Sequence, residues 1–229
     1  MELVTLEQIR KTYTQGKVKV TAIDRVDLTV SAGEFLALAG PSGSGKTTLL
    51  NIIGGLDMPD SGRVTVAGND FSTMNAGALA RLRLRSIGFV FQSYNLIPVL
   101  SAEENVEYIM LLQGVPAKER RDRARQILDD VGLEGLYSRR PSELSGGQQQ
   151  RVAVARAIVS GPSLVLADEP TANLDSKTGE GLLDLMQAIN RERHVTFIFS
   201  THDKMVMGHA GRLVNLKDGR IENDIRKGS

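Results

Sequence analysis

The feature that most constrains this sequence is a glycine-rich loop between an apolar run and a helical pattern. Phe35–Ala39 is a short apolar run, and residues 48–53 continue as an apolar helix after the loop. The loop, GPSGSGKT, has the complete GxxxxGK[ST] spacing. This order of strand, loop and helix predicts a phosphate-binding loop. Its members, with the first residue after it, are Gly40, Pro41, Ser42, Gly43, Ser44, Gly45, Lys46, Thr47 and Thr48.

The residue types in this loop suit the phosphates of a nucleotide. Glycines let successive backbone N–H groups converge on phosphate oxygens, and the helix N-terminus adds a partial positive charge. Lys46 supplies a mobile positive charge for the outer phosphates, and the Thr47 hydroxyl can bind Mg²⁺. The alternative is a glycine-rich turn that merely precedes a helix, and the full spacing disfavours it.

An acidic pair follows a buried strand further along the chain. Residues 164–167 are apolar and lead directly into Asp168 and Glu169. Asp168 would reach Mg²⁺ through water, because this ion keeps much of its hydration shell. Glu169 would face the γ-phosphate and act as base for the attacking water. The two carboxylates could instead cap the next helix, but together with the loop they predict hydrolysis of a nucleoside triphosphate.

Composition excludes several classes of protein. The chain has 229 residues, of which 41% are hydrophobic and 24% charged, which is typical of a globular domain with a real core. The formal net charge of +1 argues against a protein held to nucleic acid mainly by phosphate neutralisation. No apolar stretch approaches the roughly 18 residues that a membrane-spanning helix needs. Without cysteine there is neither a disulfide framework nor a thiolate metal site.

Strand and helix patterns alternate over much of the chain. Residues 64–66, 87–91, 164–167 and 195–199 read as strands, and Ser176–Arg191 carries an apolar stripe at helical spacing. Such alternation predicts a parallel sheet with helices on both sides.

Two regions depart from this alternation. At the N-terminus Leu3–Ile9, Val18–Val20 and Val26–Val30 lie close together between turn residues, which predicts antiparallel hairpins. From about residue 95 to 160 the signals are almost all helical, with a capping box at Ser101. We therefore expect a helical subdomain inserted into a core formed by about residues 1–92 and 161–229.

A second motif, LSGGQ, predicts another helix start. Ser145 and Gln148 form an S-x-x-Q capping box, so a helix should run to about Ser160. Two glycines in its first turn cost roughly 1 kcal/mol each relative to alanine. Bare backbone lets an anion approach the N–H groups, which predicts a second phosphate site. Two subunits packed head to tail could each close over the other's nucleotide with Ser145, Gly146, Gly147 and Gln148.

Together these motifs resemble the ATPase subunit of an ABC transporter. Gly40–Thr47 matches Walker A, Leu144–Gln148 the signature motif, and Leu164–Glu169 Walker B. The resemblance covers nearly the whole chain. It implies an α/β fold, namely a P-loop NTPase core with a parallel sheet, an N-terminal antiparallel β subdomain and an inserted α-helical subdomain. It also implies ATP and Mg²⁺ as cofactors and a homodimer around two ATP molecules.

The resemblance implies roles for four further residues. Gln92 matches the Q-loop glutamine, which joins Mg²⁺ and the attacking water to the helical subdomain. Asp175 matches the D-loop aspartate that contacts the other subunit, and His202 matches the switch histidine at the γ-phosphate. Tyr13 matches the aromatic residue that stacks on adenine, although an aromatic near a strand end is also commonly core. The implied catalytic group is Lys46, Gln92, Glu169 and His202.

Longer segments are similar to the lipoprotein-releasing and macrolide-exporter type of ABC ATPase. These are Phe91–Val106, Gly54–Asp57 and Ala167–Asp175. Members of this type work with membrane subunits that move periplasmic domains by mechanical transmission. The resemblance implies a separate transmembrane permease as partner and no direct contact with nucleic acid. It also implies a peripheral location on the cytoplasmic face of the inner membrane, through the permease.

Two other functions stay open as alternatives. An ABC ATPase of a regulatory or cell-division membrane complex would have a membrane partner that looks alike from this side. A soluble ABC ATPase that acts on nucleic acid is disfavoured, because such relatives carry very long coiled coils or two ATPase domains in one chain. This sequence has no such heptad run and a single Walker A motif.

Two weaker signals concern surfaces. Tyr94, Leu96, Ile97 and Leu100 follow the Q-loop glutamine, where the family has a groove for the membrane subunit, and core packing is an equal alternative for each. The polar tail, residues 222–229, is expected to be frayed.

Overall fold

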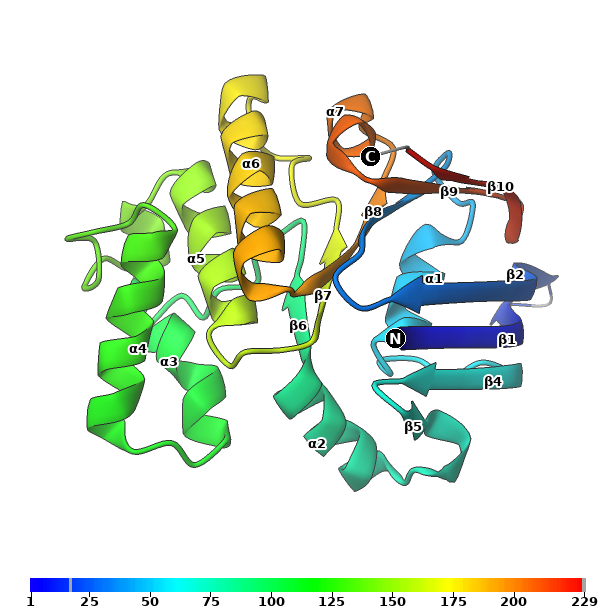
Figure 1. Cartoon of the computed structure of the whole chain (residues 1–229), viewed down its shortest axis with the longest axis horizontal. Helices are drawn as coiled ribbons and strands as arrows, with labels where there is room; N and C mark the ends of the chain where they lie inside the picture. The colour runs from blue at the N-terminus through cyan, green and yellow to red at the C-terminus, as the bar shows by residue number, and fades with distance from the viewer. Residues whose placement is uncertain (17, 228–229) are drawn as a thin grey trace.

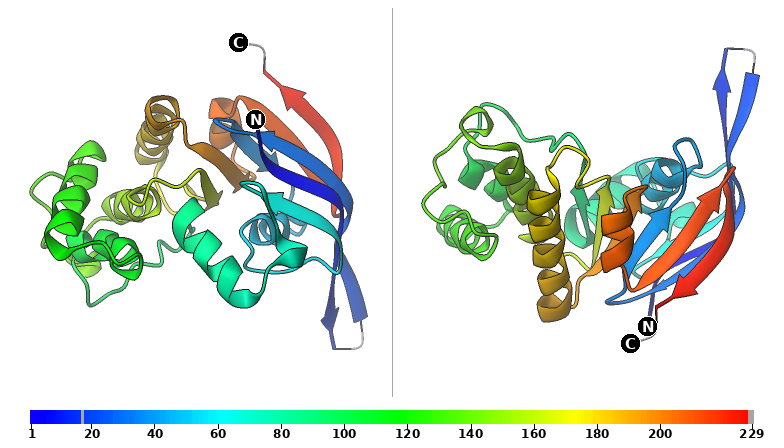
Figure 2. Two further views of the ribbon diagram at one scale, coloured as in Figure 1. Left: turned by 60° about the horizontal axis from the view of Figure 1, so that its bottom comes forward. Right: turned by 90° about the horizontal axis from the view of Figure 1, so that it is seen from above.

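The first part of the chain forms an antiparallel sheet. The computed structural model describes residues 1–16 and 18–227. The spatial order of this sheet is β2 (Val18–Ser31), β1 (Glu2–Gln15), β4 (Ser61–Val66) and β5 (Asn69–Asp70). Strands β1 and β2 form one long hairpin that extends beyond the rest of the molecule in Figure 2. Register shifts along this pair break the period-2 pattern, which is why the sequence suggested several shorter strands.

The second sheet has six strands. Their spatial order is β10 (Arg220–Arg226), β9 (Arg212–Lys217), β3 (Phe35–Ala39), β8 (Thr196–Thr201), β7 (Leu164–Asp168) and β6 (Ile87–Val90). All neighbours pair in parallel except β10 with β9, so the predicted parallel sheet is confirmed. Because the strands are parallel, their carboxyl ends meet at one edge, where such sheets bind ligands.

Helices cover both faces of this second sheet. Its neighbours include α1 (Lys46–Ile53), α2 (Ala76–Ser86), α6 (Ser176–Arg193) and α7 (Lys204–His209). Strand β3 shows how the two faces are divided. Phe35 and Ala37 join the core on the side of the inserted helices, whereas Leu36 and Leu38 join the core shared with the antiparallel sheet. The continuous apolar run of this strand therefore reflects burial on both faces.

Between β6 and β7 the chain forms only helices and loops, and every residue there is described. The elements are α3 (Ala102–Leu112), α4 (Ala117–Asp130), a 3-10 helix (Pro141–Glu143) and α5 (Gly146–Ile158). Figure 1 places α3 and α4 at the end of the molecule opposite to the antiparallel sheet. The capping box predicted at Ser101 is present, with both reciprocal bonds to Glu104.

The tail is better ordered than its polar sequence suggested. Residues 220–226 form β10, which pairs antiparallel with β9, so the expectation of fraying was wrong for this part. Arg212 donates hydrogen bonds of 2.8 and 2.7 Å to Asp224 and so ties the two strands together. The strand was missed because backbone pairing, and not burial of its side chains, holds it in place. Residues 228–229 lie outside the described part.

Helix α2 was also missed by sequence reasoning. Its three arginines alternate with leucines, so the apolar stripe is short, and only Leu79 and Leu82 are buried. The start signal was available, because Asn75 caps the helix by accepting a 2.9 Å bond from the Ala78 amide. None of the described helices is both long and apolar enough to span a lipid bilayer.

Candidate nucleotide site

The glycine-rich loop connects β3 to α1 at the carboxyl edge of the parallel sheet. Gly45 precedes the helix at φ 102°, and a Cβ there would lie 2.4 Å from the Ala22 carbonyl oxygen, so only glycine fits. No side chain caps α1, and its first turn holds no acidic residue. The first N–H groups of this helix are therefore available to an anion, as the motif predicts.

The Lys46 side chain folds back onto the loop. It is buried, and Nζ donates hydrogen bonds to the carbonyl oxygens of Gly40 at 2.8 Å and Pro41 at 2.9 Å. These bonds hold the ammonium group against the loop backbone. A positive charge fixed in this position suits the outer phosphates of a nucleotide.

The two predicted carboxylates lie beside this loop, at the end of β7. The Thr47 hydroxyl donates to Asp168 Oδ1 at 3.1 Å, although 121 residues separate the two in sequence. A hydroxyl and a carboxylate oxygen side by side are the hard oxygen donors that Mg²⁺ prefers. The observed pair thus fits the ion that the sequence predicts.

Glu169 is bonded to the predicted switch histidine. Its Oε1 lies 2.7 Å from His202 Nδ1, and Oε2 accepts a longer bond of 3.4 Å from the Thr201 hydroxyl. The backbone of Glu169 is in the left-handed region, at φ 46°, which is uncommon for a residue other than glycine. Such backbone strain is typical of functional positions. The sequence placed both residues at the γ-phosphate but gave no sign that they bond to each other.

One cavity of about 580 Å³ brings these groups together. Twelve of the residues predicted from the sequence line it, namely Tyr13, Pro41, Ser42, Gly43, Gly45, Lys46, Thr47, Thr48, Gln92, Asp168, Glu169 and His202. Two loop residues do not line the cavity. The Gly40 carbonyl oxygen accepts the bond from Lys46, and the Ser44 carbonyl oxygen accepts one from the Gly219 amide at 3.1 Å. Sequence reasoning missed Val20, Thr21 and Ala22 in the wall, because only the register of β2 against β1 brings them there.

The signature residues lie outside this cavity. Ser145 and Gln148 form the predicted capping box, with bonds of 3.3 Å from the Gln148 amide and 2.9 Å from the Ser145 amide. Asp175 caps α6 in a similar way and accepts from the amide and hydroxyl of Thr178 at 3.0 and 2.6 Å. These bonds from Thr178 lower the pKa of Asp175. None of the predicted signature or D-loop residues lines the cavity of its own chain.

The signature glycines have a packing role that the sequence did not reveal. A Cβ on Gly147 would lie 2.4 Å from Thr178 Cγ2, so a glycine lets α5 approach α6 closely. At Gly146 the nearest atom is the Tyr94 hydroxyl, at 2.9 Å from such a Cβ. Close packing thus explains glycine at the start of this helix, whereas access for an anion stays a prediction.

Gly147→Ala should lower stability by about 1–3 kcal/mol, because the added methyl group overlaps Thr178. Thr178→Ser removes Cγ2 and keeps the hydroxyl that bonds Asp175, so the double variant should recover most of the lost stability. Thermal melting of the two single variants and the double variant checks this. A double variant no more stable than Gly147→Ala would contradict the packing explanation.

The segment after Gln92 is tied to both neighbouring motifs. The Asn173 side chain donates to the Gln92 carbonyl oxygen at 2.9 Å, and Arg156 of α5 donates to the carbonyls of Tyr94 at 2.9 Å and Asn95 at 2.6 Å. Asn173 and Arg156 were not singled out by sequence reasoning, since neither carries a motif-specific signal. They connect the Q-loop to the D-loop and to the signature helix.

A family model described as "ABC transporter" matches residues 23–172. The chain belongs to this family. The lipoprotein-releasing system ATP-binding protein LolD of Anaeromyxobacter dehalogenans is 49% identical over 222 residues, which cover 96% of this chain and 93% of LolD. The macrolide export ATP-binding/permease protein MacB of Brucella melitensis biotype 1 is 48% identical over 225 residues. That match covers 98% of this chain, whereas the chain spans only 35% of the length of MacB.

A solved structure of an ABC cassette agrees with this assignment. The dimeric ATP-binding cassette MJ0796, in a post-hydrolysis state bound to ADP and Pi, matches with a TM-score of 0.92 and 42% identity. The match covers 99% of this chain and 100% of that one. The predicted family, the α/β cassette fold and the assignment as an ATP-binding ATPase are thereby confirmed. The roles of individual site residues stay predictions.

Proposed function

We propose that this ABC ATPase works as a head-to-tail homodimer that encloses two ATP·Mg²⁺ and drives a separate membrane permease. The observation that carries the proposal is the division of the motifs within one chain. The phosphate loop, Asp168, Glu169 and His202 share one cavity, whereas Ser145–Gln148 lies elsewhere. A second copy could supply its signature helix to this cavity. The dimeric state of the related MJ0796 cassette supports this arrangement.

In the proposed reaction the loop N–H groups and Lys46 bind the phosphates of ATP. Thr47 and Asp168, with Gln92, would hold Mg²⁺, which neutralises phosphate charge when bound. Glu169 accepts a proton from the attacking water. His202, bonded to Glu169 at 2.7 Å, orients that carboxylate and contacts the γ-phosphate.

In the proposal the free energy of ATP binding closes the dimer. Each ATP would bridge Lys46 and Thr47 of one copy to the helix N-terminus at Ser145–Gly147 of the other. The capping box at Ser145 uses the Gln148 and Ser145 amides, and the N–H groups of Gly146 and Gly147 in the same first turn favour negative charge. Once the γ-phosphate is cleaved and released, the bridge is lost and the dimer can open. Asp175, which caps α6 near the signature helix, would contact the other copy as the D-loop residue.

For the wider role, we propose a lipoprotein-release or macrolide-export type of mechanical transmission. The support is the similarity over nearly the whole chain to LolD and to the ATP-binding part of MacB. In this proposal the protein lies on the cytoplasmic face of the inner membrane and is held there by the permease. A regulatory or cell-division complex is the alternative, and no observation on this chain favours it.

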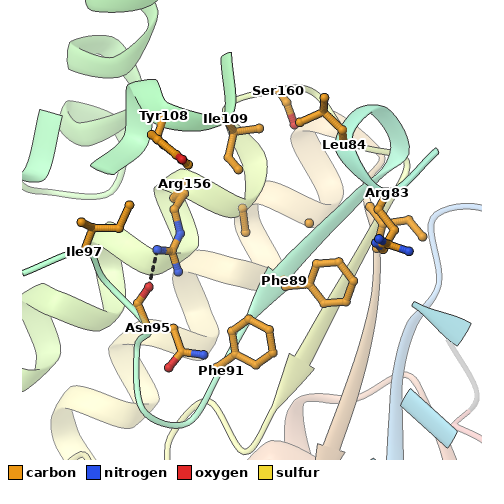
Figure 3. Close-up of a pocket in the computed structure, with 13 residues that line it drawn as sticks. Arg83, Leu84, Phe89, Phe91, Asn95, Ile97, Tyr108, Ile109, Arg156 and Ser160 are labelled. Atoms are coloured by element: carbon orange, nitrogen blue, oxygen red, sulfur yellow. Dashed lines mark hydrogen bonds between the residues drawn. The ribbon is translucent and has the colours of Figure 1, made fainter. Parts of the chain in front are cut away.

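We propose that a groove beside the Q-loop is the binding site of the permease. It is a largely apolar cavity of about 360 Å³ between β6, α3 and α5, lined among others by Phe89, Phe91, Ile97, Tyr108 and Arg156 (Figure 3). The Phe89 and Phe91 rings stack with centroids 5.8 Å apart. Exposed apolar surface of this kind marks interaction sites.

Of the four residues predicted for groove or core, one lies in the groove and one packs against the core. Ile97 lines the groove, and Leu96 packs against the core. Tyr94 lies over Gly146, and Leu100 lines a separate, charged cavity on the helical side. Leu96 is therefore a poor probe of partner binding, because its substitution would also disturb packing against the core.

Tyr108→Asp tests the proposed binding site of the permease. Tyr108 is 39% exposed on α3, so a carboxylate there should fold but oppose insertion of an apolar segment. We expect at least a tenfold loss of co-purification with the proposed membrane subunit, with ATPase activity retained in the isolated chain. Leu112→Asp is the matched control, since Leu112 is 54% exposed on the same helix but outside the groove. Equal retention of both variants by the membrane subunit would contradict the proposal.

A further inference from the structure

A carboxylate to which neither the motifs nor the family resemblance gave a role holds two side chains of β1. Asp57 lies in the loop that follows α1. Its Oδ2 accepts a 2.6 Å hydrogen bond from the Tyr13 hydroxyl, and its Oδ1 accepts a 2.7 Å bond from Lys11 Nζ. The Met58 amide also donates to Oδ1, at 2.7 Å. Tyr13 lines the nucleotide cavity, whereas Asp57 does not.

The charges in this group fix which atoms donate. Burial alone would raise the pKa of Asp57, but the bonds from Lys11, Tyr13 and the Met58 amide outweigh it and lower that pKa. Burial and the Asp57 bond raise the pKa of Tyr13. At neutral pH Asp57 is therefore an anion and Tyr13 a neutral donor. Bonds of this charge-assisted kind are shorter and stronger than bonds between neutral groups.

Lys11 restrains the same ring from a second direction. Its Nζ lies 5.3 Å from the centroid of the Tyr13 ring, within reach of a cation–π interaction. Nζ also donates to the Met58 carbonyl oxygen at 2.7 Å, so the loop after α1 holds the ammonium in place. The ring is thus fixed through its hydroxyl by Asp57 and through its π-system by Lys11, although it is 37% exposed.

We propose that Asp57, with Lys11, is a positioning residue that preorganises Tyr13 as the stacking platform for the base of the nucleotide. The proposal rests on the proposed contact of Tyr13 with that base. A free ring would have to be immobilised when the nucleotide binds, and this loss of freedom weakens binding. A ring already fixed by Asp57 avoids that loss. The hydroxyl of Tyr13 serves Asp57 and leaves the ring face for the base.

The proposal predicts an effect on binding and not on chemistry. Tyr13→Phe keeps the ring and removes the donor to Asp57, so KM for ATP should rise about three- to tenfold with kcat unchanged. Asp57→Asn should produce a rise of the same order. The double variant should raise KM by clearly less than the product of the two single effects, because both changes break the bond between Tyr13 and Asp57. Since every base has a π-face, KM for GTP should rise by the same factor.

Asp60→Asn is the matched control. Asp60 lies in the same loop and bonds β1 through the Thr12 amide at 2.7 Å. It has no bond to Tyr13, and its Oδ1 lies 3.9 Å from Lys11 Nζ, much further than the 2.7 Å bond from Lys11 to Asp57. Its KM should stay within twofold of the wild-type value. Thermal melting of every variant shows whether it folds, and KM and kcat are then compared for folded protein only.

The outcomes separate this proposal from the one on which it rests. If Tyr13→Ala raises KM but Tyr13→Phe and Asp57→Asn do not, Tyr13 contacts the base and the Asp57 proposal is wrong. If Tyr13→Ala leaves KM unchanged, the proposed role of Tyr13 itself is wrong. A fall in kcat at constant KM in Asp57→Asn, or effects that add in the double variant, would also overturn the Asp57 proposal.

Discussion

Glu169→Gln is expected to lower the rate of ATP hydrolysis at least about 100-fold, because an amide cannot accept the proton of the attacking water. Glutamine has the same shape and can still bond His202 and Thr201, the two partners of the carboxylate at 2.7 and 3.4 Å. The site should therefore fold and bind ATP with nearly unchanged affinity. Turnover assays and equilibrium binding of ATP check the two halves of this prediction.

Arrested hydrolysis should also change the state of assembly. With bound ATP no longer cleaved, closed dimers of Glu169→Gln should accumulate and be measurable by light scattering, and should disperse when ATP is removed. Glu192→Gln is the control, since Glu192 is an exposed carboxylate at the far end of α6 and should leave turnover unchanged. Turnover of Glu169→Gln at the wild-type rate would show that Glu169 is not the base.

Lys46→Ala is expected to lower affinity for ATP about 10- to 100-fold, the range for loss of hydrogen bonds to a charged group. The reason is geometric as well as electrostatic. The bonds from Nζ to Gly40 and Pro41 place the ammonium against the loop, and the buried setting shields its charge from water. Calorimetric titration with a non-hydrolysable ATP analogue measures the loss.

Lys46→Arg separates the effect of the positive charge from that of the geometry. It keeps the positive charge, but the guanidinium is too large for a side chain that is 6% exposed, so affinity should not be restored. Melting temperatures without nucleotide show whether either substitution has disturbed the loop. ATP affinity of Lys46→Ala equal to that of wild type would contradict the assigned role.

Most of the site residues could be predicted from short sequence motifs. The phosphate loop, the acidic pair and both capping boxes are short sequences whose geometry depends mainly on neighbouring residues. Continuous apolar runs such as Phe35–Ala39 correctly indicated strands buried on both faces. The family resemblance then supplied Gln92 and His202, and both line the same cavity as the loop.

Contacts between residues far apart in the sequence could not be predicted from local patterns. Arg156 lies 61 residues from the Asn95 carbonyl that it bonds, and Asp57 lies 44 residues from Tyr13. An arginine in a helix or an aspartate in a loop is ordinarily a solvated residue, so only the fold reveals these partners. Strand β10 was missed for a similar reason. Its side chains are mostly polar and show no strand pattern, and the strand is stabilised by backbone pairing with β9.

The central claim is that each ATP site is shared between two copies of the chain, and mixing two inactive variants tests it most directly. Lys46→Ala removes the phosphate lysine, and Gly146→Asp places a carboxylate at the helix start that would face the ATP of the other copy. Each variant alone should hydrolyse ATP at background rate. A mixed dimer has one site with both defects and one site with neither.

Measured as ATP turnover, a 1:1 mixture should therefore recover up to about a quarter of wild-type activity, since half the dimers are mixed and each has one intact site. Gly146→Asp should fold, because the nearest atom to its Cβ is the mobile end of Tyr94. Recovery of activity on mixing is the result that the shared site predicts. A mixture of folded variants that stays at background would contradict it.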